Sequence, residues 1–165
     1  MHSFYLDASA LAKRFVPEQG SPVIDQILDK VPGERLYILN VGAGEVVSIL
    51  VRKRNAGVIS DPYFRQALVD FDDEIVRSAD INKLPISNRL ATSSFALIVA
   101  HSINSTDAVT LKSALAIERK LRAGGNGFVL VASDQRLLRA AQSEGLTTFN
   151  PETQDQTALA AFMRP

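Results

Sequence analysis

Short apolar runs alternate with longer amphipathic segments along the chain. The apolar runs at 4–6, 36–39 and 128–132 predict strands, and a further short strand is expected at 146–149. Segment 80–84 is ambiguous, because a proline limits it at residue 85. The run at 128–132 is continuously apolar rather than alternating, which is typical of a strand buried on both faces of a parallel sheet. We therefore expect it near the sheet centre.

Helical periodicity fills most of the remaining chain, and glycine or proline punctuates it. The predicted helices cover residues 10–15, 23–28, 41–55, 61–79, 90–101, 105–122 and 135–141, with a last helix expected after Pro151. Asn40, Asp61 and the pair Ser133-Asp134 have the side chains that cap helix N-termini. Gly57 and Gly145 are predicted to stop the helices that precede them.

Strands that alternate with helices favour a parallel sheet, because parallel neighbours need crossover helices that cover both sheet faces. The predicted fold class is therefore α/β, a three-layer α/β/α sandwich with a central parallel sheet. No repeat, linker or low-complexity stretch divides the chain, so we expect a single domain over residues 1–165. In such folds the functional residues lie at the carboxyl ends of the strands.

The amino-acid composition limits how the chain can bind phosphates and which ligands it can offer to a metal ion. The chain has 165 residues, of which 46% are hydrophobic, which is enough for one sizeable core. Eighteen basic residues balance eighteen acidic ones, so binding to phosphates must depend on local patches. The chain has no cysteine and only two histidines, His2 and His101, and His101 is expected to end a helix rather than bind a metal. A metal ion would therefore need oxygen ligands.

The N-terminus has only a short apolar run before Asp7, which is less than a signal peptide requires. The expected location is the cytoplasm. The most apolar stretches are far shorter than the roughly 18 residues that span a bilayer, so no membrane association is expected.

Four acids are predicted near strand ends or helix starts. Asp7 follows the first strand and Asp134 lies two residues past the apolar run at 128–132, which places both at one edge of the sheet. Asp107 lies in the first turn of its helix, and Glu45 lies near the start of the helix after the second strand. Each aspartate has a structural alternative as a helix cap, and the spacing of Glu45 alone indicates an ordinary solvated acid.

Together the four acids indicate a cation site more strongly than any one of them does. Carboxylates that lie close together at one edge of a sheet repel each other unless cations bind between them. Magnesium prefers oxygen ligands and is usually held by a few carboxylates plus a substrate phosphate. Two such ions can activate a water and stabilise the leaving oxygen of a phosphodiester.

Four motifs in chain order carry a resemblance to a known family. They are Tyr5-Leu6-Asp7-Ala8-Ser9-Ala10-Leu11, Gly44-Glu45-Val46-Val47-Ser48, Ser105-Thr106-Asp107-Ala108-Val109, and Val131-Ala132-Ser133-Asp134-Gln135-Arg136-Leu137-Leu138. Over nearly its whole length the chain resembles the PIN-domain nucleases, in particular the VapC-like toxins of toxin–antitoxin pairs.

The resemblance implies a ribonuclease that uses Mg²⁺ or Mn²⁺. By this likeness Asp7 and Asp107 bind the metal most directly, and the other two acids complete the pocket. Ser9 and Ser133 would orient the carboxylates or water, although both could also be structural caps. The resemblance further implies an RNA substrate, a homodimer and a cognate antitoxin whose segment lies over the pocket.

Three basic residues could hold a substrate phosphate. Arg52 follows Glu45 by two helical turns on the same face, and the alternative is a solvated basic run at a helix end. Arg136 and Arg139 share that ambiguity. Two other functions stay open: a catalytically inactive PIN-like module that binds RNA or protein, and a signalling receiver domain. A receiver would need a lysine after the last strands, and the chain has none there.

Overall fold

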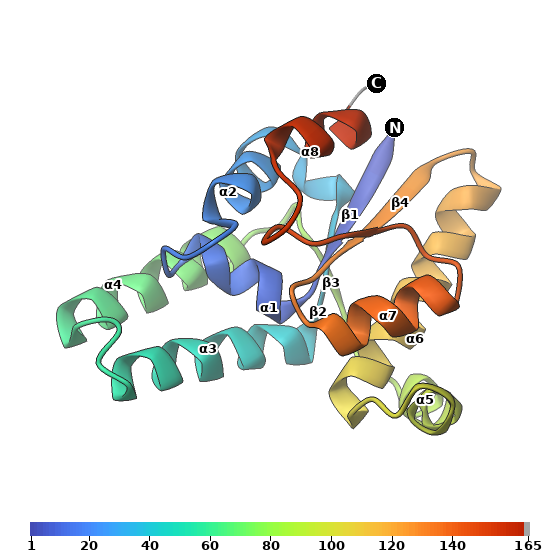
Figure 1. The fold of residues 1–165 in the computed structure, drawn as a ribbon, viewed down its shortest axis with the longest axis horizontal. Coiled ribbons are helices and arrows are strands. Elements are labelled where there is room, and N and C mark those ends of the chain that lie inside the picture. The colour runs from blue at the N-terminus through green and yellow to red at the C-terminus, as the bar shows by residue number, and fades with distance from the viewer. Residues whose placement is uncertain (164–165) are drawn as a thin grey trace.

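Five parallel strands form the centre of the computed structural model, which describes residues 1–163 (Figure 1). The strands are β1 (His2–Leu6), β2 (Leu36–Leu39), β3 (Asn82–Leu84), β4 (Gly127–Val131) and β5 (Thr148–Phe149). Their order across the sheet is β3-β2-β1-β4-β5, so β1 lies in the middle and pairs with both β2 and β4. The end of the domain predicted over 1–165 lies outside the described residues.

Helices connect the strands and cover the sheet. They are α1 (Ala8–Leu11), α2 (Ser21–Lys30), α3 (Asn40–Asn55), α4 (Asp61–Phe71), α5 (Asn88–His101), α6 (Ser105–Ala123), α7 (Gln135–Ser143) and α8 (Gln156–Met163). Short 3₁₀ turns lie at η1 (Ala12–Arg14) and η2 (Gly33–Arg35), and a π-helical turn lies at η3 (Asp72–Val76). No helix within residues 1–163 is long and apolar enough to cross a membrane.

Side chains that alternate along the strands build two hydrophobic cores, one on each sheet face. Phe4 and Leu6 of β1 pack with α1 to α4 and α8, whereas Tyr5 between them packs with α5 to α7. In β4, Val129 and Leu130 divide in the same way. Helices therefore cover both faces of a parallel sheet, which confirms the predicted three-layer α/β/α sandwich (Figure 1).

Several helix boundaries and caps predicted from the sequence were wrong, because local hydrogen bonds place them at other residues. The helix expected over 61–79 ends at Phe71 and continues as the wider turn η3, in which the Arg77 N–H donates to the Asp72 carbonyl five residues back. Ser60, not Asp61, caps α4, because its hydroxyl accepts from the Tyr63 N–H. Of the ambiguous segment 80–84, the last three residues form the edge strand β3.

The start of α3 differs in the same way. The Asn40 side chain makes no capping hydrogen bond, because Asn40 is already the first residue of the helix and Leu39 takes the cap position. The predicted first helix is also divided, into α1 and η1. Gly57 and Gly145 have left-handed backbone conformations just past the ends of α3 and α7, as their stop signals predicted.

A buried lysine joins distant parts of the chain. The Lys13 side chain is only 2% exposed, and its ammonium contacts Glu18 Oε1 at 2.8 Å and Glu152 Oε1 at 2.7 Å. Lys53 of α3 contacts the other oxygen of Glu18. A buried charge is tolerated only when it is paired, so this cluster fixes the segment after β5 against the N-terminal helices. The sequence pattern gave no sign of it.

Buried side chains of the strands should contribute most to stability. Leu130 of β4 is fully buried, so Leu130→Ala is expected to lower the free energy of unfolding by about 2–5 kcal/mol. Val99 of α5 is 84% exposed, and Val99→Ala should change the free energy of unfolding by less than about 0.5 kcal/mol. Urea unfolding of both variants beside the wild type measures the difference, and equal midpoints would contradict the assignment of the core.

A candidate acidic site at the carboxyl edge of the sheet

The strand order creates one crevice at the carboxyl edge of the sheet. After β1 the chain moves to β2 on one side, whereas β4 lies on the other side of β1, so the connections diverge between β1 and β4. Ligands of open α/β sheets bind at such a point. Asp7 directly follows β1, and its N–H donates to the Val131 carbonyl at the end of β4 at 2.9 Å. Asp134 comes three residues after Val131.

All four predicted acids line one cavity of about 310 Å³ at this edge. They come from four places in the fold: the turn before α1, and helices α3, α6 and α7. The lining residues are Asp7, Ala8, Ser9, Glu45, Ser48, Ile49, Arg52, Asn104, Asp107 and Asp134. The structure thus brings together the four acids, Ser9 and Arg52, whereas Ser133 is not part of the lining.

Ser9 connects two of the acids. Its N–H and its hydroxyl both donate to Asp7 Oδ2, at 3.0 and 2.6 Å. The same hydroxyl oxygen accepts from the backbone N–H of Ser133 at 2.9 Å and, more weakly, from that of Asp134 at 3.3 Å. Ser9 therefore fixes the Asp7 carboxylate and holds the segment that carries Asp134 against it.

Ser133 behaves differently from Ser9. Its hydroxyl is buried and has no hydrogen-bond partner within residues 1–163, while its backbone N–H takes part in the contact with Ser9. The structure therefore does not bring the Ser133 hydroxyl to a carboxylate. Of the two serines, only Ser9 contacts a predicted site acid through its side chain.

Asp134 and Asp107 are both helix-start residues and cavity residues. Asp134 Oδ1 accepts from the N–H groups of Arg136 and Leu137 at 2.7 and 3.0 Å, which confirms it as the cap of α7. Asn104 caps α6: its Oδ1 accepts from the Asp107 N–H, and its Nδ2 donates to Asp107 Oδ2 at 2.9 Å. The capping alternative and the pocket prediction therefore both hold for Asp134, whereas Asp107 lines the pocket and Asn104 caps its helix.

Asn104 is a site residue that the sequence analysis missed. An asparagine three residues before an acid at the start of a helix is an available capping signal, since the two side chains and backbones can bond reciprocally. The helix starts at Ser105, as predicted, and the capping signal lies in the residue before it.

Glu45 lines the cavity, although its position in the helical repeat of α3 predicted a side chain exposed to solvent. Val46 and Leu50 of α3 face the core, whereas Glu45, Ile49 and Arg52 share the neighbouring face, which covers the sheet edge. A helix that packs on two sides does not show a single apolar stripe. The interpretation of Glu45 as a solvated acid was therefore wrong, and its place in the pocket, expected from the resemblance, is the one observed.

Burial and neighbouring charges raise the pKa values of Asp7, Glu45 and Asp107. Burial, and then the charges of Asp134 and Asp7, raise the pKa of Asp107 to about 6. Burial also raises the pKa of Asp7, with the charge of Asp134 adding to it and hydrogen bonds from Ser9 opposing it. For Glu45 burial again raises the pKa most, and the charges of Asp7 and Asp107 add to it. Burial is therefore the main cause of the raised pKa values of Asp7, Glu45 and Asp107, and the charges of neighbouring acids add to it.

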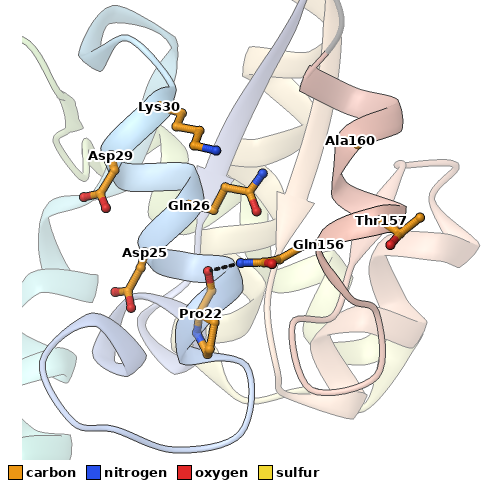
Figure 2. Close-up of a pocket in the computed structure, with 8 residues that line it drawn as sticks. All are labelled: Pro22, Asp25, Gln26, Asp29, Lys30, Gln156, Thr157 and Ala160. Atoms are coloured by element: carbon orange, nitrogen blue, oxygen red, sulfur yellow. Dashed lines mark hydrogen bonds between the residues drawn. The ribbon is translucent and has the colours of Figure 1, made fainter.

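A larger cavity lies elsewhere in the molecule. It encloses about 740 Å³ between α2 and α8 (Figure 2). Gln156 spans this groove and donates to the Pro22 carbonyl at 3.2 Å, while Asp25 and Asp29 are paired with Arg14. Its acids are therefore already neutralised, and its remaining polar side chains are amides, a lysine and a threonine. The smaller acidic cavity is the better candidate for chemistry.

Comparison with known proteins decides the family. The profile of the PIN domain matches residues 4–143, which is most of the chain and includes all four acids. The chain belongs to the PIN domain family. No curated protein matches it.

Solved structures share the PIN fold at low sequence identity. PAE2754 from Pyrobaculum aerophilum has a TM-score of 0.63 and 18% identity over 92% of this chain and 90% of that one. FitAcB from Neisseria gonorrhoeae has a TM-score of 0.61 and 13% identity over 92% of this chain and 99% of that one. VapC20 from Mycobacterium tuberculosis is described as a toxin that cleaves the sarcin-ricin loop. It has a TM-score of 0.59 and 16% identity over 93% of this chain and 100% of that one. At these identities the likeness shows the fold.

The donor set of this PIN domain suits a hard divalent cation. Every candidate ligand is a carboxylate oxygen, which is what Mg²⁺ and Mn²⁺ prefer. Within residues 1–163, however, no three acidic or histidine side chains stand close enough to form a finished metal-binding group.

The raised pKa of Asp107 predicts a pH-dependent stability. An acid whose pKa is higher in the folded state, here about 6 against about 4 unfolded, stabilises the fold when protonated, and that stability is lost as pH rises through 6. In metal-free protein Asp107→Asn should therefore raise the free energy of unfolding at about pH 8, by on the order of 1 kcal/mol after solvent screening. The gain should vanish near pH 4, as urea unfolding at both pH values would show.

Asp61→Asn provides the control for this experiment, because the Asp61 side chain is 72% exposed on α4. This substitution should change the free energy of unfolding only slightly at both pH values. A pH-independent effect of Asp107→Asn, or a loss of stability at high pH, would show that the carboxylates do not repel each other as described.

Proposed function

We propose that the protein is an endoribonuclease that depends on Mg²⁺ or Mn²⁺ and serves as the toxin of a toxin–antitoxin pair. The observation that carries the proposal is the convergence of four carboxylates from separate elements on one cavity, where burial, with neighbouring acidic charges adding to it, raises the pKa values of Asp7, Glu45 and Asp107. Membership of the PIN domain family supports it. The sarcin-ricin loop cleaving toxin VapC20, which shares the fold, makes RNA the first substrate to test.

Asp7 and Asp107 are the proposed direct metal ligands, and Glu45 and Asp134 complete the site. When bound, Mg²⁺ or Mn²⁺ would polarise a phosphodiester oxygen and make water a stronger nucleophile at neutral pH. Hydrogen bonds orient the carboxylates of Asp7 and Asp107 through Oδ2 and that of Asp134 through Oδ1.

The remaining cavity residues position the substrate. Arg52 of α3 lies in the cavity wall beside Glu45, and a guanidinium can hold a phosphate through two parallel hydrogen bonds. In the proposed reaction a water oxygen attacks phosphorus and the bond to the 3′ oxygen breaks. The products are a 5′-phosphate and a 3′-hydroxyl, the latter taking up a proton.

The proposal extends to location and partners. A cytoplasmic toxin would require an antitoxin that covers the acidic cavity, and a homodimer is proposed as well. Apolar side chains that such partners could cover are present on the surface: Val69 of α4 and Phe95 and Val99 of α5 are exposed.

The alternative is a catalytically inactive PIN module that binds RNA or protein. The observation that favours it is the separation of the carboxylates, which form no finished metal-binding group within the described part of the chain. The two functions differ in one respect that can be measured, because only the enzyme changes the covalent structure of RNA.

Asp7→Asn should abolish metal-dependent cleavage. Because partners of metal ligands typically contribute about 10–100-fold, loss of a ligand should reduce the rate of RNA cleavage by more than about 100-fold, and Ser9→Ala by about 10–100-fold. The assay is cleavage of total cellular RNA with Mg²⁺ or Mn²⁺, followed by sequencing of the new ends.

Asp61→Asn is the matched control and should cleave like the wild type, since it removes an exposed carboxylate far from the cavity lining. Cleavage that persists in EDTA or in Asp7→Asn would contradict the proposed site. Binding of RNA without cleavage by any form, metal present, would favour the inactive module.

A further inference from the structure

We propose that a second cavity beside the acidic site binds a phosphate of the same RNA strand, next to the phosphate that is cleaved. This inference rests on the proposed function for its choice of ligand. The cavity has a volume of about 230 Å³ and lies between the end of α5 and one face of α7. Its lining residues are His101, Ser102, Arg136, Arg139, Ala140 and Ser143.

Two unpaired cations face this cavity. Arg136 and Arg139 are three residues apart on α7, so their side chains lie on the same face of the helix. Within residues 1–163 neither forms a salt bridge, whereas Arg14, Arg77 and Arg122 all do. A concave surface that carries two guanidinium groups without a carboxylate partner is complementary to an anion, and guanidinium matches phosphate geometry in particular.

The nearby carboxylate is occupied by another residue. Glu144, which follows α7, contacts His101 Nε2 through Oε1 at 2.7 Å, and the His101 side chain is only 15% exposed. The Ser143 hydroxyl donates to the Arg139 carbonyl, so it does not engage the guanidinium. Glu144 therefore anchors His101 as one wall of the cavity and leaves the two arginines to a ligand.

The basic and acidic cavities share two walls. In the loop between α5 and α6, Ser102 lines the basic cavity and Asn104 lines the acidic one. At the start of α7, Asp134 lines the acidic cavity and Arg136 the basic one, and two residues span at most about 7 Å. The charge of Arg136 also lowers the pKa of Asp107, opposing the effects that raise it.

This arrangement fits a linear polyanion. Arg52 lies in the acidic cavity on α3, and Arg136 and Arg139 lie beyond it on α7. A strand that crosses the carboxylates thus meets cations on both sides, which offset the repulsion between its phosphates and the acids. The overall charge is neutral, so these local patches are the cationic features available to such a strand here.

The test is the salt dependence of binding to a labelled single-stranded oligoribonucleotide of mixed sequence, measured in EDTA so that cleavage is not required. For single strands each phosphate contact contributes about 0.7 to the slope of log K against log salt. Arg139→Gln should make the slope shallower by about 0.7, and the double variant Arg136→Gln/Arg139→Gln by about 1.4. Arg119→Gln, which alters an exposed arginine on the distal half of α6, should leave it unchanged.

Each outcome decides between the two proposals. An unchanged slope in both cavity variants would overturn the phosphate subsite, whether or not the protein cleaves RNA, and would direct attention to an acidic protein partner. A shallower slope in a protein that never cleaves RNA would support the subsite and overturn the nuclease. Absence of any RNA binding by the wild type at low salt in EDTA would overturn the subsite, whereas the nuclease is tested separately by cleavage in Mg²⁺ or Mn²⁺.

Discussion

Repulsion between carboxylates at one sheet edge is the constraint around which this site is built. Burial and the neighbouring charges raise the pKa of Asp107 to about 6, so the metal-free fold carries an electrostatic cost at neutral pH. Contacts on each acid offset part of that cost: Ser9 for Asp7, Asn104 for Asp107, and the N-terminus of α7 for Asp134. A divalent cation would offset the rest.

The fold tolerates this cost because the site stands on its most rigid elements. β1 and β4 lie at the centre of the sheet, between two cores, and their ends carry Asp7 and the segment to Asp134. The hydroxyl of Ser9 joins these two ends. The buried Lys13 cluster fastens the chain after β5 to the helices behind β1. Precise positions therefore follow from packing, as a preorganised site requires.

Much of this organisation could be predicted from local pattern, and the failures have physical causes. The apolar run of β4 predicted a buried strand at the sheet centre; the strand is observed beside the central β1, and Asp134 after it lines the cavity. Glu45 could not be placed from spacing, because α3 packs on two sides. The π-helical turn after Phe71 was hidden, since one extra residue disturbs the apolar period without leaving a signal of its own. The Lys13 cluster joins residues 139 positions apart, which no local pattern can reveal.

The most direct test of the central claim is the binding of Mn²⁺ to the purified protein, followed by electron paramagnetic resonance. The account predicts binding by the wild type, affinity at least about tenfold weaker in Asp107→Asn and Asp134→Asn, and wild-type affinity in Asp61→Asn. Asn at 134 keeps the cap of α7, so that variant tests charge rather than folding. Equal binding by all four proteins, or none by the wild type, would contradict a cation site at the carboxyl edge of the sheet.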